Sequence, residues 1–216
     1  MKYTLIFILF FSSICFISNA QDPIFSNSQQ SLLYLNPSFA GSNGNVRFQS
    51  IFSNQTLNSL STYFTTYNGF DIYLKKIKGG LGLTYLKDYQ ANGALVTDRI
   101  DLTYAQHFSL LNKKLKITPS LQVTYLQKHL DKTKIFYDYQ PHPNFISWTQ
   151  NEAVPFQTKR NFDLSSGLII NYKHFYFGSS VFHINQPDEG LLMYSRLNAR
   201  INLFASQNIS IGKKIV

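Results

Sequence analysis

The chain has 216 residues and a formal net charge of +9, but only 14% of its residues are charged, against about 25% in ordinary globular domains. Aromatic residues make up 16% of the chain, and its single cysteine excludes a disulfide within it. Few charges, many Phe and Tyr residues and no long apolar segment beyond the start are typical of a transmembrane β-barrel, whose strands show only one face to lipid.

The first 20 residues have the order of a secretory signal peptide. Lys2 precedes an apolar run over residues 5–17, and small residues stand at −3 and −1 of a cleavage site after Ala20. The run is shorter than the roughly 20 apolar residues of a spanning helix. Bulky Ile14 argues against a lipoprotein site at Cys15. We therefore predict an exported chain, for which nucleic acid is not an expected partner despite the positive charge.

The stretch at residues 22–44 is neither a clean helix nor a clean strand. Residues 26–35 can form a short helix that ends before Pro37, because the residue before a proline is disfavoured in the helical region. The apolar side chains here are Leu32, Leu33, Leu35 and Phe39. They predict a segment that packs inside a barrel, or against its mouth, as a plug. A disordered leader is the alternative, which this apolar content disfavours.

Apolar and polar residues alternate along most of the remaining chain, as they do in strands with two different faces. Clean alternation covers residues 46–53, 80–85, 99–108, 115–125, 161–172 and 196–203; it is weaker over 62–74 and 174–184, and a ninth segment starts at Ile209. Most segments reach or exceed the roughly 9–11 residues that a tilted strand needs to cross a bilayer. We predict an all-β chain: an antiparallel outer-membrane β-barrel over residues 46–216, incomplete, with about eight or nine strands. Residues 21–45 are its plug segment, and a soluble β-sandwich is the alternative.

The connections between these segments differ in length. Short ones are predicted at residues 75–78, 111–113, 173–174 and 207–208, and longer ones at 55–61, 89–94, 128–160 and 185–195. Short and long connections thus alternate, as they do in outer-membrane barrels, whose short turns lie in the periplasm.

Lysines gather in or beside the short connections. They include Lys75, Lys76, Lys78, Lys113, Lys114 and Lys173. At one end of a barrel they would form a cationic rim that attracts anionic headgroups or an acidic protein partner. Turn lysines that are merely solvated are the alternative.

The connection at residues 128–160 is unusually long and aromatic. Its candidate partner-binding residues are Tyr137, Tyr139, His142 and Trp148. Long loops are often functional, and aromatic side chains anchor interfaces. A loop that folds inward to constrict the lumen is the equal alternative.

The sequence carries no pattern typical of catalysis. Its five histidines lack metal-ligand spacing, and it has no Gly-x-Ser-x-Gly motif. We therefore expect no enzymatic activity, cofactor or metal site.

The stretch that follows the leader also resembles the start of mature chains of the PorP/SprF family. Its two elements are Asp-Pro-x-Phe-Ser and Leu-Tyr-Leu-Asn-Pro-Ser-Phe-Ala-Gly. The residues concerned are Asp22, Pro23, Phe25, Leu33, Tyr34, Leu35, Asn36, Pro37, Phe39 and Gly41. Residues 175–190 resemble a further segment of the family.

The resemblance implies a non-enzymatic outer-membrane component of the type IX secretion and gliding-motility machinery of a Gram-negative bacterium. Such a protein would contact outer-membrane lipid, assist the export or surface attachment of adhesins and anchor to a periplasmic peptidoglycan-associated partner. Family members continue beyond the position of Val216, so the resemblance also implies a chain truncated at its C-terminus. The alternative is an outer-membrane transporter or channel for small hydrophobic molecules, with the opening stretch as its plug.

Overall fold

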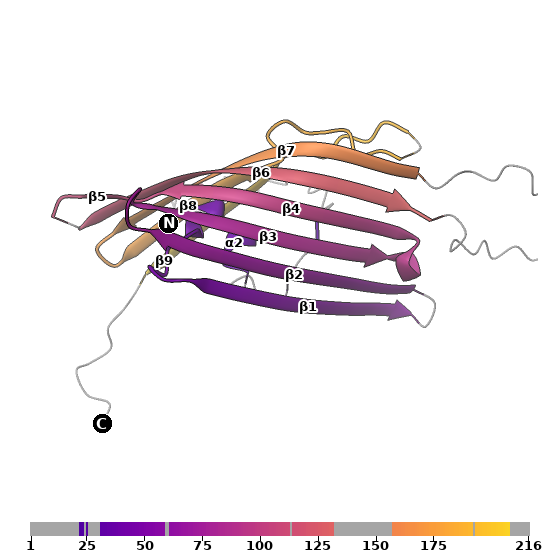
Figure 1. The fold of residues 1–216 in the computed structure, drawn as a ribbon, viewed down its shortest axis with the longest axis horizontal. Helices are drawn as coiled ribbons and strands as arrows, with labels where there is room; N and C mark the ends of the chain where they lie inside the picture. Colours follow the sequence, from indigo (N-terminus) through magenta and orange to yellow (C-terminus); the bar gives the residue numbers. More distant parts are fainter. Residues whose placement is uncertain are drawn as a thin grey trace, which may run out of the picture.

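The computed structural model describes residues 22, 23, 25, 31–58, 61–112, 114–131, 157–191 and 193–207. Within them, the chain forms an antiparallel sheet that curls into a half-barrel (Figure 1). The strand order is β1-β2-β3-β4-β6-β7-β8-β9, with the short β5 paired to β6. The prediction of an all-β, incomplete antiparallel barrel is confirmed.

Eight of the strands correspond to the segments predicted from alternation. The strands are β1 (Arg47–Asn58), β2 (Ser61–Leu74), β3 (Gly79–Gln90), β4 (Leu95–Gln106), β5 (Phe108–Leu110), β6 (Leu115–Leu130), β7 (Gln157–Tyr172), β8 (Phe175–Phe182) and β9 (Arg200–Gln207). Only Phe108, the first residue of β5, falls in the segment predicted at residues 99–108, and His107 separates β5 from β4. The segment predicted from Ile209 lies outside the described residues.

Two connections that were expected to be long are short, so the predicted alternation of short and long connections is wrong. Residues 55–58 belong to β1, and β3 continues to Gln90. The backbone ladder persists there: Thr56 pairs with Thr62, and Gln90 pairs with Leu95. Backbone pairing does not need an apolar face, so the hairpins extend beyond the residues that alternate.

The two faces of the sheet differ in chemistry. Leu102, Leu121 and Leu203 on the convex outer face expose 60%, 68% and 69% of their surface, whereas Asp101 and Gln122 on the concave face expose 3% each. Other exposed apolar side chains are Phe48, Phe52, Leu83, Val123, Phe162, Leu164, Phe175, Phe177 and Ile201. An apolar surface of this extent marks a face that meets a membrane or another protein.

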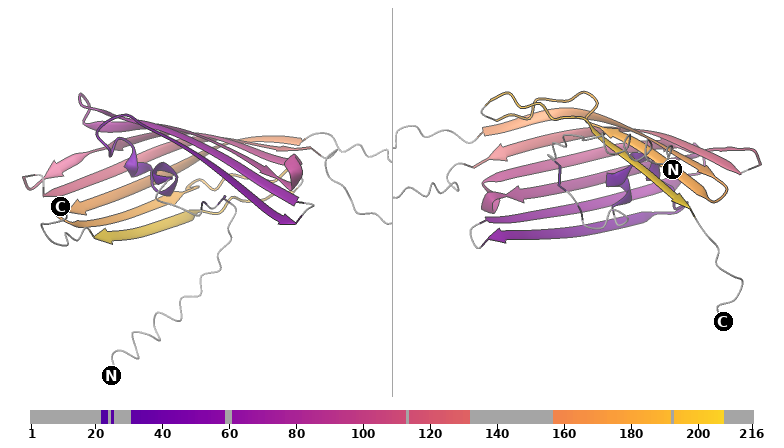
Figure 2. Two further views of the ribbon diagram at one scale, coloured as in Figure 1. Left: turned by 90° about the horizontal axis from the view of Figure 1, so that it is seen from below. Right: turned by 180° about the vertical axis from the view of Figure 1, so that it is seen from behind.

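The helical elements are short. They are α2 (Leu32–Leu35) and the 3₁₀ helices η2 (Pro37–Phe39) and η3 (Ala91–Gly93). None of the helices in the described part of the chain has the length and apolar content to cross a membrane. In the views of Figure 2, α2 and η2 lie in the hollow of the curved sheet.

Candidate functional site

The N-terminal segment occupies the concave face of the half-barrel (Figure 2). Leu33 of α2 is 2% exposed and packs with Ala40 and with Ala105 of β4. The described part of the helix expected over residues 26–35 is α2, which ends before Asn36. The carbonyl oxygen of Leu35, at the end of α2, accepts hydrogen bonds from side chains of β8 and β9. The short helix is thus tied to strands far away in the sequence.

The Asn-Pro-Ser part of the motif joins β6 and β8 from inside. The side-chain oxygen of Asn36 accepts a hydrogen bond from the Ser38 amide at 2.9 Å, and its amide nitrogen donates to the Ser179 carbonyl at 2.8 Å. Pro37 takes the first position of η2, where its fixed φ suits the helix. The hydroxyl of Ser38 lies 2.8 Å from that of Ser120. Each residue of this tripeptide therefore has a local or tertiary role.

Two glycines of the sheet allow the segment to approach the strand backbone. A Cβ atom on Gly80 would clash with the carbonyl group of Ala40, and one on Gly167 would clash with the side-chain oxygen of Asn36. Gly41 has a φ of +69°, and a Cβ there would lie 2.7 Å from the Cα atom of Gly80. Glycine is required where two backbones meet this closely.

The segment is tied to β1 and β2 through one buried carboxylate. Asp71 is 1% exposed, accepts a hydrogen bond from the Gly41 amide at 2.8 Å, and pairs with the Arg47 guanidinium at 2.7 Å. Arg47 also donates to the Phe39 carbonyl at 3.0 Å. Phe39 stacks on Phe204 with ring centroids 5.5 Å apart. The end of the motif therefore contacts both edges of the half-barrel.

The start of the motif carries a carboxylate into a cluster of cations. Asp22 lies 2.7 Å from Arg200, 2.9 Å from the His183 ring and 4.0 Å from Arg99. Burial would raise the pKa of Asp22, but the hydrogen bond from His183 and the charges of Arg200 and Arg99 outweigh burial and hold that pKa well below its usual value. Asp22 is therefore ionised at neutral pH.

Two further carboxylates complete this cluster. The ring of His183 lies 2.6 Å from Asp163, and Arg99 pairs with Asp101 at 2.7 Å. With His183 protonated, three cations face three anions when Asp22 and Arg200 are included. A buried group of charges needs this balance, because an unpaired buried charge is costly.

Tyr34 connects the two halves of the motif. Its hydroxyl donates to the Pro23 carbonyl at 2.7 Å and accepts from Arg200 at 3.1 Å. The ring centroid of Phe25 lies 5.1 Å from that of Tyr34, and Tyr67 packs against both rings. Burial and the nearby charge of Asp22 raise the pKa of Tyr34 to about 12, so the hydroxyl keeps its proton.

A small cavity lies beside Asp22. Its lining includes Arg99, Lys128, Asp163, Glu189 and Leu197, and its volume is about 40 Å³. That holds a few water molecules at most and is far below the roughly 300–1,000 Å³ of ligand pockets. Within the described residues, no three His, Cys, Asp or Glu side chains are grouped so that they could hold a metal ion.

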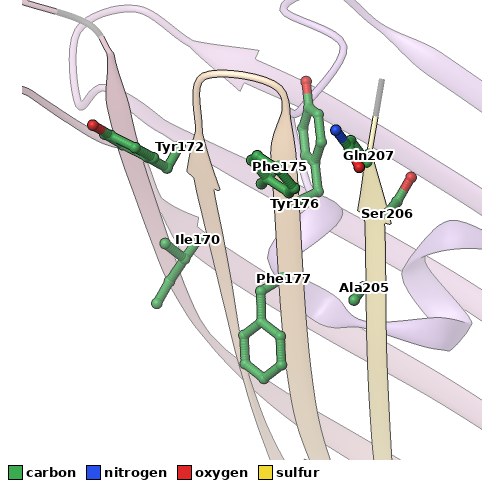
Figure 3. A pocket seen from close by; sticks show the side chains of 8 residues that line it. All are labelled: Ile170, Tyr172, Phe175, Tyr176, Phe177, Ala205, Ser206 and Gln207. Atoms are coloured by element: carbon green, nitrogen blue, oxygen red, sulfur yellow. The ribbon is translucent and has the colours of Figure 1, made fainter. Parts of the chain in front are cut away.

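A larger hollow of about 420 Å³ lies at one end of β7, β8 and β9 (Figure 3). Ile170, Tyr172, Phe175, Phe177 and Ala205 line it. The side chain of Lys173 extends over the Tyr172 ring at 5.3 Å. The hollow is open and mainly apolar, and a lysine stands at its edge.

The structure places the lysines of the short turns at one end of the sheet. Lys75, Lys76, Lys78, Lys114 and Lys173 are exposed, and Lys113 lies outside the described residues. Leu74 pairs with Gly79, and Gly79 pairs with Gln106. The turn before β3 and the turn after β4 therefore lie at the same end of the sheet. Leu115 pairs with Tyr172, which brings the β7–β8 turn to the same place. A cationic rim that binds a partner stays a prediction.

The other predicted site cannot be placed. Tyr137, Tyr139, His142 and Trp148 all lie outside the described residues, so the partner loop also stays a prediction.

Sequence reasoning did not find the cluster around Asp22. Arg99 and Asp101 fall on the polar face of an alternating segment, which in a barrel points inward. That signal identifies them as interior charges. It does not identify their partners, because Asp22 and Arg200 are 178 positions apart in the chain.

Comparison with known proteins gives one finding. The sequence model of the family described as "Type IX secretion system membrane protein PorP/SprF" matches residues 17–214. No curated protein and no solved structure matches the chain. The family match covers nearly the whole chain, including the N-terminal motif that lies inside the half-barrel. The chain therefore belongs to the PorP/SprF family of type IX secretion system membrane proteins.

Proposed function

We propose that this protein is a non-enzymatic outer-membrane component of the type IX secretion and gliding-motility machinery. In this role it assists the export or surface attachment of adhesins and anchors to a periplasmic peptidoglycan-associated partner. Family membership supports the secretion role. The observation that supports the rest is the position of the N-terminal motif, whose described residues pack against the inner face of the sheet and against each other.

The outer face of the half-barrel supports a place in the outer membrane. Leu102, Leu121 and Leu203 all stand outward beside inward polar neighbours. This is the pattern of strands that face lipid on one side. The predicted leader, cleaved after Ala20, would direct the chain to export.

Membrane fractionation tests the location. We expect the protein in the outer-membrane fraction, with a mobility in gels that shifts on heating, because folded barrels resist detergent and unfold only when heated. Recovery in the soluble periplasmic fraction would contradict the proposal. Deleting the gene should lower the amount of adhesin at the cell surface, and restoring the full chain should restore it.

Transport of small hydrophobic molecules is the rival function. The interior cavity beside Asp22 is about 40 Å³, which is too small for such a molecule unless the plug moves. The hollow at the end of β7–β9 is larger, but exposed side chains of the outer face, such as Phe175 and Phe177, form part of its lining. Conductance or substrate uptake by the purified protein in lipid bilayers would favour the transporter over the export component.

A further inference from the structure

The interior cations converge on Asp22 from three separate elements. Arg99 comes from β4, Arg200 comes from β9, and His183 follows β8. Asp22 lies within 2.9 Å of Arg200 and of His183, and its own side chain is 16% exposed. Asp22 therefore has three basic partners, although it precedes α2 by ten positions in the chain.

We propose that Arg99, Arg200 and His183 form a carboxylate-binding site inside the half-barrel, and that the chain's own Asp22 occupies it as a releasable latch for the N-terminal segment. The proposal concerns the interior alone and does not depend on which secretion partner the protein binds.

The site is built to persist without Asp22. Arg99 is held by Asp101 at 2.7 Å, and His183 is held by Asp163 at 2.6 Å. The Arg200 guanidinium lies over the Phe182 ring at 4.3 Å. Each cation thus has a second contact that fixes its position, so the site is preorganised for a carboxylate.

The cations also have spare donors. Nη2 of Arg99 and Nε of Arg200 are buried and make no hydrogen bond to any described residue. An unsatisfied buried donor costs free energy. The cavity of about 40 Å³ beside Asp22 leaves space next to the site. Another carboxylate could therefore replace Asp22 and use these donors while the three cations keep their positions.

Loss of Asp22 would change the charge of the cluster. Two arginines and a protonated His183 would then face only Asp101 and Asp163, which leaves one positive charge in excess. The excess can be removed by a second carboxylate or by deprotonation of His183. Release of the latch is therefore linked to the proton on His183.

Charged and titratable groups from several elements surround Asp22 and His183. They are Arg99 and Asp101 from β4, Asp163 from β7, Arg200 from β9, Tyr34 from α2, and Asp88, Lys128 and Glu189 around the cavity. Burial would lower the pKa of His183, but its hydrogen bonds to Asp163 and Asp22 raise that pKa above the ordinary 6.5. The contribution of the charged ring is fully present below pH 6.5 and is lost as the pH rises through the raised pKa.

For Asp22 the sign is opposite. Its pKa is lowered, so the contribution of its charge is present above its ordinary value of 3.8 and is lost only as the pH falls through the lowered pKa. The latch is therefore closed in the mildly acidic range and loosens when His183 loses its proton.

Labelling of a cysteine next to the latch tests the proposal. The parent is the full chain with Cys15→Ser and Pro23→Cys, folded in lipid nanodiscs and treated with a bulky maleimide. Each labelling rate is divided by that of the denatured protein at the same pH, so that it reports the open fraction. Asp22→Asn should raise this ratio about 10- to 100-fold, the scale of hydrogen bonds to charged groups. Asp98→Asn removes a partly exposed ion pair with Lys87 and weakens the hydrogen bond from the Tyr85 hydroxyl, and it should change the ratio less than about twofold.

A thermodynamic cycle and a competitor give independent readouts. Arg200→Gln should also raise the labelling ratio. The double variant Asp22→Asn, Arg200→Gln should raise the ratio by less than the product of the two single effects, because the two substitutions remove the same interaction. For the parent, sodium acetate should accelerate labelling more than sodium chloride at equal ionic strength. Raising the pH through the titration of His183 should also raise the labelling ratio of the parent.

The labelling rates of the variants and of the parent decide whether Asp22 occupies an exchangeable carboxylate site. If Asp22→Asn labels no faster than Asp98→Asn, Asp22 does not hold the segment and the proposal fails. If the variants do not fold, the parent alone decides: equal labelling in acetate and chloride overturns the carboxylate site. Faster labelling in acetate supports a site that exchanges one carboxylate for another.

Discussion

Gly80 and Gly167 show how single residues position the N-terminal segment. A Cβ atom added to either glycine would point into the half-barrel, where the N-terminal segment takes the space that a side chain would fill. Gly82, two residues further along β3 on the same face, differs: a Cβ there would meet its neighbours at 3.4–3.5 Å, which is ordinary contact. Neighbouring glycines of one strand therefore have different requirements.

Replacing Gly80 and Gly82 by alanine, one at a time, should show that only Gly80 must lack a side chain. Gly80→Ala should cost about 1–3 kcal/mol of the free energy of unfolding, because the Ala40 backbone must shift. Gly82→Ala should be neutral or slightly stabilising, by at most about 1 kcal/mol, because alanine restricts the unfolded chain. Denaturant unfolding of both variants in the same lipid measures the difference. Equal losses would mean that the segment does not lie on Gly80.

The motif residues could be located from the sequence, but their contacts could not. Apolar Leu33 and Phe39 predicted a packed segment, and Pro37 predicted the end of a helix. The carbonyl groups to which the Asn36 side chain donates lie more than 130 positions away, on β7 and β8. Local patterns hold no information on such pairs, because the curling of the sheet around the N-terminal segment creates them.

At the scale of elements, β6 shows how alternation becomes two surfaces. Leu121 and Val123 stand outward, and Ser120, Gln122 and Thr124 stand inward and are buried. The hydroxyl of Thr124 donates to Asp101 at 2.6 Å, so the inner face is a hydrogen-bonded polar layer. The outer face has no comparable polar groups at these positions and is suited to lipid.

Arginine at two equally exposed leucines should reveal membrane depth. Leu121, near the middle of β6, and Leu111, in the β5–β6 turn, expose 68% and 65% of their surface. Leu121→Arg should lower the free energy of unfolding by about 2–4 kcal/mol if it lies near the bilayer midplane, and Leu111→Arg by about 0–1 kcal/mol at the interface. Unfolding from phospholipid vesicles measures both. Similar costs at the two sites would argue against a membrane around β6.

Strand existence was predictable, but strand ends were not. The apolar alternation of residues 115–125 identified β6, which in fact continues to Leu130. At the far end, Leu130 pairs with Gln157 and His129 pairs with Thr158, so backbone bonds extend the hairpin beyond the alternating residues. The alternation of connection lengths failed for the same reason.

At the scale of the molecule, the two ends of the half-barrel carry different elements. The lysine turns and the segment around Gly41 share one end, because Gly41 lies against Gly80 at the start of β3. The other end carries η3, the end of β6 at Leu130 and the start of β7 at Gln157. The end that faces the periplasm decides which partners can reach the N-terminal segment.

Single cysteines at the two ends should establish the orientation. Lys76→Cys lies in the β2–β3 turn, and Ala91→Cys lies in η3 at the opposite end; both native residues are exposed. If the lysine turns are periplasmic, an impermeable biotin-maleimide should label Ala91→Cys on intact cells and should label Lys76→Cys only after the outer membrane is opened. The reverse pattern would put the lysines outside.

With the turns in the periplasm, the lysines should govern how fast an acidic partner is captured. Exposed charges mainly set the association rate and its salt dependence, whereas buried apolar contacts set dissociation. Reversing Lys75, Lys76 and Lys78 to glutamate should therefore slow the association of the purified partner and flatten its dependence on salt, and leave the dissociation rate nearly unchanged. The control compares Lys76→Glu with Arg160→Glu, because each changes the net charge by two and Arg160 is an exposed residue near the start of β7, away from these turns. If both variants slow association equally, overall charge and not the rim is responsible, and the cationic rim is not a docking surface.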